Sequence, residues 1–329
     1  MGGVQGMRPR AITVAFWRLL VQLRERDCQM GGHRQAEPLE RERLGQRVGG
    51  NVSKNTFVVG QVLVVLALAS GAAAAPLISA SGLDGAGVGI NPSQIGRVWG
   101  EAAFHSQDDL TIFAPTFGAG FTPIPELELN FVLPITHVSG EGDSKTVLGN
   151  VYVGANYLSL DGPVRATVGL GIALPTAPTD DFESVIAGSL GFYPHGAQHM
   201  ELRIPGYTDV LVPLHLEMGT RVVGSLDGSF HFSIPSSDIR DDQDTKTMAT
   251  IAPGFGIYLS ERVIAGMRLP MWFYLPDDED DHAQVTVEPF LRLNLGQQGF
   301  LGVRFNVPVD DPLKEADMWG LHLGGGGAF

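Results

Sequence analysis

The sequence predicts an all-β fold, a closed antiparallel transmembrane β-barrel of about twelve strands. Three observations lead to this prediction: long runs of alternating apolar and polar residues, connections that alternate between tight and long, and a last run that ends in an aromatic residue. Alternation with a period of two gives a strand one apolar and one polar face. Because a bilayer offers no hydrogen-bond partner to an open sheet edge, strands that cross it must close into a barrel.

The last run, Asp317 to Phe329, places large apolar side chains at alternate positions. Trp319, Leu321, Leu323 and Phe329 fall on one face, and Met318, His322 and four small residues fall on the other. This stretch resembles the closing strand of bacterial outer-membrane β-barrel proteins, in which the terminal aromatic residue is part of the signal read by the barrel assembly machinery. The resemblance implies a place in the cell outer membrane and a contact between Phe329 and that machinery.

Twelve runs fit strands within residues 97–329, the predicted barrel domain. Each is close to or above the ~9–11 residues that a tilted strand needs to cross a bilayer. The run from Leu127 to Ile135 shows the pattern, because Glu128 and Asn130 separate its apolar residues. The predicted strands cover residues 97–106, 109–121, 125–137, 146–160, 163–175, 208–219, 221–234, 246–260, 262–274, 283–295, 299–308 and 317–329.

The connections between these runs alternate in length. With twelve strands, every tight turn falls on the side of the C-terminus, as expected for the periplasmic turns of an outer-membrane barrel. The longest connection, Ala177 to Tyr207, is expected to hold a short helix from Phe182 to Tyr193 that constricts or plugs the mouth. A further hairpin in this connection is the alternative, and it would give fourteen strands.

The segment before the barrel divides into three parts. Residues 1–51 have no sustained apolar period, and we interpret them as a start codon assigned too early, a disordered extension or a targeting segment. Residues 52–74 are predicted to be a signal peptide, because an apolar stretch is followed by a run of small residues. A membrane helix from Phe57 to Ala75 is the alternative. Residues 75–96 are rich in glycine and serine and predict a flexible periplasmic lead-in.

The chain of 329 residues has a net charge of −14, which is unevenly distributed. The first 75 residues hold ten basic and five acidic residues, so the remainder holds 12 basic and 31 acidic ones. This acidic excess argues against nucleic acid as a partner. Cys28 is the only cysteine, so no disulfide is expected. The sequence has no P-loop, Gly-x-Ser-x-Gly or His-Glu-x-x-His motif, and we predict no cofactor or metal site.

The polar faces of the strands are predicted to face the lumen. There, side chains of both charges could select hydrated solutes or could pair and fill the interior. Twelve strands lie between the filled eight-stranded barrels and the sixteen-stranded barrels with an aqueous channel. Small residues at many inward positions favour a narrow pore. The residues predicted to line it are Glu126, Glu128, Asn130, Arg165, Glu217, Arg221, Asp227, Arg268, Glu288, Arg292 and Arg304.

Two connections, 238–244 and 277–282, are rich in aspartate. Hard cations such as calcium prefer several carboxylate oxygens, but neither loop has the spacing of an EF-hand. Solvated loops that face a lipopolysaccharide layer bridged by divalent cations are the favoured interpretation. Asp281 beside His282 raises the hypothesis of a barrel hydrolase, for which a dipeptide gives little support. The protein is therefore predicted not to be an enzyme.

Two pairs of short motifs carry a narrower resemblance. The segment LEL at 127–129 is followed by LP at 133–134, and GLG at 169–171 is followed by LPT at 174–176. These segments resemble the family of outer-membrane transporters associated with phenol-degradation operons of the MetA pathway. The resemblance implies a transport channel.

These observations together predict a monomeric outer-membrane channel for the passive transport of small solutes. Its other partners would be outer-membrane lipid and lipopolysaccharide. A closed structural or surface-interaction barrel without conductance is the alternative, and a barrel hydrolase is the third hypothesis.

Overall fold

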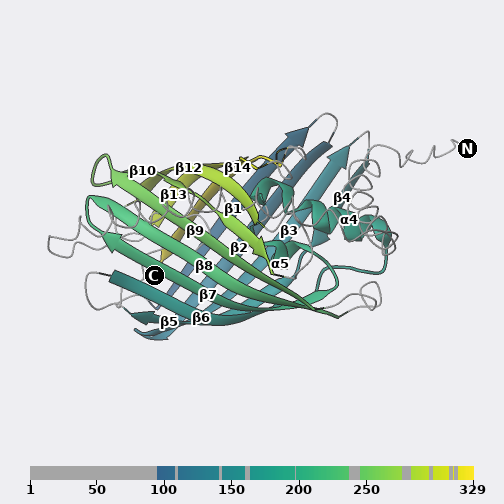
Figure 1. Ribbon diagram of the computed structural model, residues 1–329, viewed down its shortest axis with the longest axis horizontal. Coiled ribbons are helices and arrows are strands. Elements are labelled where there is room, and N and C mark those ends of the chain that lie inside the picture. The colour runs from purple at the N-terminus through teal and green to yellow at the C-terminus, as the bar shows by residue number, and fades with distance from the viewer. Residues whose placement is uncertain are drawn as a thin grey trace, which may run out of the picture. The chain divides into compact units, whose positions relative to one another are not determined.

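The structure, a computed structural model, describes residues 95–107, 110–140, 143–159, 164–196, 198–236, 245–275, 283–295, 299–310, 314 and 318–329. In this part of the chain, antiparallel strands follow one another around a closed barrel (Figure 1). The expected N-terminal extension, the signal peptide, nearly all of the lead-in and both aspartate-rich loops lie outside the described residues.

The described residues contain fourteen strand segments. β1 pairs with β14, so the first and last strands close the sheet; Arg97 lies opposite Ala328, and Phe104 lies opposite Leu321. The segments are β1 (Gly96–Gln107), β2 (Leu110–Ile124), β3 (Leu127–Gly140), β4 (Asp143–Leu148), β5 (Val151–Ser159), β6 (Val164–Leu174), β7 (Tyr207–Gly219), β8 (Val222–Pro235), β9 (Lys246–Tyr258), β10 (Val263–Arg268), β11 (Met271–Tyr274), β12 (Ala283–Leu295), β13 (Gly299–Pro308) and β14 (Gly320–Ala328).

Two pairs of segments each act as one strand of the wall, which gives the barrel twelve strands. β4 and β5 both pair with β3, in its second and first halves respectively. β10 and β11 both lie between β9 and β12. The prediction of twelve strands is confirmed. The alternative with fourteen is wrong, because the long connection between β6 and β7 holds helices.

Both interruptions have identifiable causes. Between β4 and β5, Asn150 leaves the ladder and its Nδ2 donates to the carbonyl oxygens of Glu201 (3.0 Å) and Ile204 (2.8 Å). Between β10 and β11, Pro270 has no N–H to give to a ladder. Its carbonyl oxygen still accepts from the backbone N–H of Thr286. Neither break opens the sheet, because the neighbouring strands continue past it.

The wall exposes apolar side chains and buries polar ones, the reverse of a soluble protein. On β12, Leu291, Leu293 and Leu295 are 46%, 40% and 51% exposed, whereas Arg292 and Asn294 between them are buried. A sheet with this pattern is suited to acyl chains outside and a polar lumen inside. Among the described helices, none is long and apolar enough to span a membrane.

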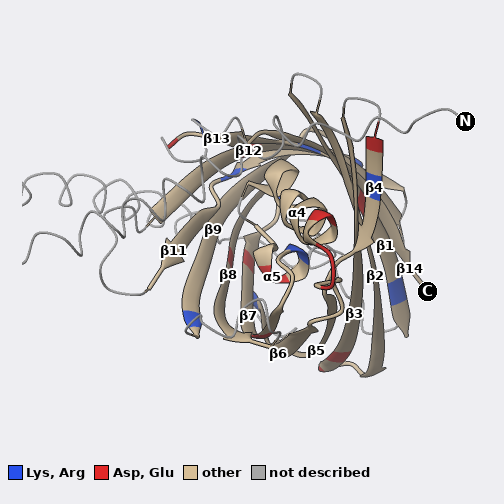
Figure 2. Ribbon diagram, turned by 90° about the vertical axis from the view of Figure 1, so that its right-hand side faces the viewer, with Lys and Arg blue, Asp and Glu red and all other residues tan. Residues whose placement is uncertain are grey.

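The connection between β6 and β7 folds into the barrel. It contains α4 (Phe182–Leu190), the 3₁₀ turn η2 (Tyr193–His195) and α5 (Met200–Arg203), and we call the described residues from 182 to 203 the plug. Figure 2, which looks along the barrel, shows α4 and α5 inside the ring of strands. The helix expected to begin at Phe182 is therefore present, although it ends at Leu190 and the 3₁₀ turn follows it.

Candidate functional site

Arg203, the last residue of α5, attaches the plug to the barrel wall. Its guanidinium group is fully buried and donates hydrogen bonds to Ile135 O (2.5 Å), Thr136 Oγ1 (3.0 Å) and Thr116 Oγ1 (2.6 Å). Its Nη2 also lies within 3.3 Å of two carbonyl oxygens of β2. One side chain of the plug thus binds both β2 and β3, mainly through backbone and hydroxyl oxygens.

A second set of contacts holds η2 and the residues after it. The carbonyl oxygen of Pro194 accepts a hydrogen bond from His322 Nε2 at 2.7 Å, and Asn306 Nδ2 lies 3.5 Å from the same oxygen. Gln198 Nε2 donates to Glu288 Oε1 at 2.6 Å. These contacts join the plug to β12, β13 and β14, on the side of the barrel that closes against β1.

The charges around the plug alternate in sign along the inner wall. Arg304 Nη2 lies 2.9 Å from Glu101 Oε1, and Arg304 Nη1 lies 3.7 Å from Glu288 Oε2. Arg268 lies 3.2 Å from both Glu288 and Asp227. Buried charges are costly unless they are paired, and each of these has a partner of opposite sign. The inner wall is therefore charged but locally balanced.

The predicted pore-lining residues fall into three groups, and the prediction that they line a pore stays a prediction. All of those on strands are at least half-buried, and the two in turns at strand ends are exposed. The buried residues are Glu128, Glu217, Arg268, Glu288, Arg292 and Arg304. The half-buried residues are Asn130, Arg165 and Asp227, and the exposed ones are Glu126 and Arg221.

Several residues of the site were not predicted from the sequence. Arg97 and Glu101 lie on the inner face of β1, where Arg97 Nε donates to Glu128 Oε1 at 2.6 Å. Their positions four residues apart put both on one face of a strand, so the period-two pattern could have identified them. Glu201 and Arg203 belong to a connection without a period, and no sequence signal points to their role.

Burial and charge act in opposite directions on the two ionisable groups of α5. Burial lowers the pKa of Arg203 to about 9, although the charges of Glu101 and Glu201 oppose this change. Burial alone would raise the pKa of Glu201, but a hydrogen bond from His199 and the charges of His231 and His199 lower its pKa overall. Arg203 is thus predominantly cationic and Glu201 is anionic at neutral pH.

His195, at the end of η2, is neutral at the same pH. Its side chain is buried, and this burial, together with the positive charge of Arg203, holds its pKa well below the ordinary value of histidine. The carboxylate of Glu101 opposes this change, with Oε1 3.7 Å from His195 Nδ1. Neither His195 Nδ1 nor Glu101 Oε2 has a hydrogen-bond partner among the described residues.

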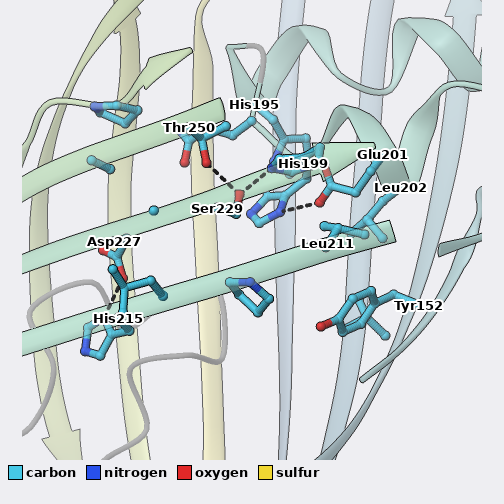
Figure 3. A pocket seen from close by; sticks show the side chains of 18 of the residues that line it. Tyr152, His195, His199, Glu201, Leu202, Leu211, His215, Asp227, Ser229 and Thr250 are labelled. Carbon is cyan, nitrogen blue, oxygen red and sulfur yellow. Dashed lines mark hydrogen bonds and ion pairs between the residues drawn. The ribbon is translucent and has the colours of Figure 1, made fainter. Parts of the chain in front are cut away.

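A cavity of about 250 Å³ lies against the plug inside the lumen. Figure 3 shows part of its wall, to which Tyr152 and Leu211 contribute from the strands and His199 and Glu201 from the plug. Arg268 also lines it. The cavity therefore combines apolar and aromatic surface with paired charges, and part of its wall belongs to the plug.

Ser229, His231 and Glu201 have the residue types of a hydrolase triad, and in space the histidine lies between the serine and the carboxylate. Ser229 Oγ contacts His231 Nε2, but it also lies 2.7 Å from Thr250 Oγ1, and His231 Nδ1 is 3.6 Å from Glu201 Oε2. A separation of 3.6 Å is too long for the hydrogen bond that orients the histidine of a triad. Asp281 and His282, the basis of the hydrolase hypothesis, lie outside the described residues.

Comparisons with known proteins rest on the fold. No protein-family model matches the sequence, and no curated protein matches it. The COG4313 outer membrane channel from Pseudomonas putida F1 is similar in structure, with a TM-score of 0.52, 12% identity, and coverage of 73% of this chain and 97% of that one. The NanC porin (TM-score 0.43, 8% identity, 71% and 98% coverage) and the KdgM porin (0.41, 8%, 71% and 99%) are less similar.

The closed barrel and the structural similarity to an outer-membrane channel show that the chain has the fold of outer-membrane β-barrels. Membership of the transporter family associated with phenol-degradation operons stays a prediction, because no family model matches.

Proposed function

We propose that the protein is an outer-membrane channel for the passive transport of small solutes, in which the plug controls the width of the lumen. The observation that carries this proposal is a closed twelve-stranded wall around a cavity of about 250 Å³ and a plug attached through a few polar side chains. In smaller barrels, side chains alone fill the interior. A barrel that served only for mechanical support would therefore need no such cavity.

The balanced charges of the inner wall support selection by polarity. Arg97 pairs with Glu128, and Arg304 pairs with Glu101, so positive and negative groups face one another across short distances. Such pairs give a transverse field without a large net potential. We propose that this field favours small hydrated or dipolar solutes over ions of a single charge.

The proposal keeps four predictions about the partners of the barrel. Outer-membrane lipid covers its apolar outer face, lipopolysaccharide surrounds its outer end, and the chain acts as a monomer. The barrel assembly machinery binds the last strand at Phe329, whose side chain is 64% exposed and whose backbone N–H donates to Gly96 O.

Single-channel conductance in planar bilayers tests the proposal. The wild type is compared with a variant in which residues 178–205 are replaced by a short Gly-Ser linker. A short linker can join β6 to β7 because Ala173 and Asp209, near the ends of these strands, already lie opposite each other. We expect a small, fluctuating conductance from the wild type and a steady, several-fold larger one from the variant.

The control for this experiment is the folded state of both proteins, measured by circular dichroism and by the change in gel mobility on heating. If both proteins are folded and neither conducts, the channel proposal is wrong, and the closed structural barrel takes its place.

A further inference from the structure

Three side chains that can bind metal converge where the plug meets the closing seam of the barrel. Glu101 comes from β1, His322 from β14 and His195 from η2, and their exposed fractions are 6%, 0% and 1%. One potential ligand atom of each lies within 4.8 Å of the others. We propose that these residues bind a divalent transition metal ion such as Zn²⁺, which would fasten the plug to the seam.

The residue types fit such an ion. Two imidazole nitrogens and one carboxylate oxygen are a common ligand set for Zn²⁺ with an open fourth position. Glu101 and His195 also line the cavity, whereas His322 lies behind them. The cavity therefore supplies both an entry route for the ion and room for a water molecule as the fourth ligand.

The hydrogen bonds of His322 favour the required tautomer. Its Nε2 lies 2.7 Å from the carbonyl oxygen of Pro194, and a carbonyl oxygen can only accept. In the neutral ring, Nδ1 then carries a lone pair directed at Glu101 Oε1, 2.7 Å away. Two acceptors this close need a shared cation, which is either a second proton on the ring or a metal ion. A backbone carbonyl that holds the second nitrogen of a histidine is also a usual feature of metal sites.

Two further atoms of this cluster have no hydrogen-bond partner among the described residues. They are His195 Nδ1 and Glu101 Oε2, both fully buried. Buried polar atoms without a partner are rare and often mark a missing water or ion.

Arg304 is the competitor that an incoming ion must displace. Its Nη2 lies 2.9 Å from Glu101 Oε1 and 3.3 Å from His322 Nδ1, so the guanidinium group bridges two of the ligands. Its Nη1 lies 3.7 Å from Glu288 Oε2, which offers a carboxylate when Glu101 binds the ion. Arg203 has five contacts shorter than its 3.5 Å contact with His195 Nε2, so it needs no support from that ring.

Zn²⁺ and Co²⁺ titrations test the site. The purified full chain is first treated with a chelator and freed of any affinity tag, and binding is measured by calorimetry and by the visible absorption of Co²⁺. We expect a single saturable site per chain. His195→Ala, His322→Ala and Glu101→Gln should each weaken it at least tenfold.

His199→Ala is the matched control, because His199 lies on the same plug segment but its side chain is not among the three ligands. We expect this variant to bind Zn²⁺ as the wild type does. The proposal is overturned if the folded wild type binds no Zn²⁺, or if the three ligand variants keep the wild-type affinity. Binding is measured without conductance, so this result is independent of whether the barrel transports solutes.

Discussion

The barrel wall and the plug are held by different kinds of interaction. The wall is a continuous antiparallel ladder that returns from β14 to β1, so its stability is spread over many backbone pairs. The plug is held by a few buried side chains, chiefly Arg203 and Asn150. A single substitution should therefore move the plug far more easily than it opens the wall, and the following predictions test this difference.

Arg203→Ala should have the largest effect. It removes the donor for several buried oxygen atoms, and leaving such atoms unpaired should weaken docking of the plug on the order of 3 kcal/mol. We expect single-channel conductance to rise several-fold while the heat-dependent gel shift of the barrel stays unchanged. Arg262→Ala, which changes an exposed arginine in the turn between β9 and β10, is the control. Loss of the folded barrel in Arg203→Ala would show that wall and plug are not separable.

Gly320→Ala should act on the plug through packing. A Cβ at position 320 would lie 1.9 Å from the carbonyl oxygen of Pro194, so η2 must shift, at a cost of about 1–3 kcal/mol. Gly299→Ala adds a methyl group with no atom closer than 3.4 Å and serves as the control. Protease cleavage within the plug should be faster only in Gly320→Ala, and equal rates in the two variants would contradict the predicted contact.

Mild acid should loosen the plug without affecting the wall. Because the pKa of His195 is lowered in the folded state, the released plug binds a proton that the docked plug does not, and docking weakens as the pH falls below about 6.5. Glu201, whose pKa is lowered by His199 and His231 despite burial, contributes only at lower pH, near the ordinary range of a carboxylate.

The pH prediction is measured as plug cleavage between about pH 7.5 and pH 5, with a chelator present so that bound metal plays no part. Cleavage should become faster toward acid in the wild type and change less in His195→Gln. The same pH dependence in both proteins would assign it to another group.

Lys145→Ala should have the smallest effect. Lys145 Nζ lies 3.3 Å from Asp181 and 3.9 Å from Glu183, but all three side chains are well exposed, and such pairs contribute little. Asp181→Ala should matter more, because Asp181 also accepts from the backbone N–H of Ser184 at the start of α4. The order of the two effects is measured by plug cleavage, and a larger effect of Lys145→Ala would contradict it.

The sequence predicted the wall better than the plug for a physical reason. Period-two alternation is a local property, so runs such as Val285 to Leu295 could be identified without knowledge of their neighbours. The break at Asn150 could not, because it depends on carbonyl groups of Glu201 and Ile204 that come from a distant connection. The role of Arg203 also depends on distant acceptors, and a lone arginine in a loop carries no pattern that indicates them.

The charged residues of the lumen show the same limit of prediction from sequence. Alternation placed Arg268, Glu288 and Arg304 on the inner face of the wall, and the structure buries all three. Their partners were not predictable, because pairs such as Arg304 with Glu101 join the two ends of the chain. The aspartate-rich loops and nearly all of the N-terminal segments lie outside the described residues, so the predictions for them stay predictions.

The most direct test of a plug that controls passage is a disulfide between Gly191→Cys on the plug and Thr136→Cys on β3, with Cys28 replaced by serine. A Cβ at position 191 would lie 2.2 Å from Thr136 Oγ1, so the two positions are close enough to bridge. Single-channel conductance of this one protein is compared before and after reduction. We predict a low, steady conductance when it is oxidised and larger, fluctuating openings when it is reduced; identical conductance in both states would contradict the account.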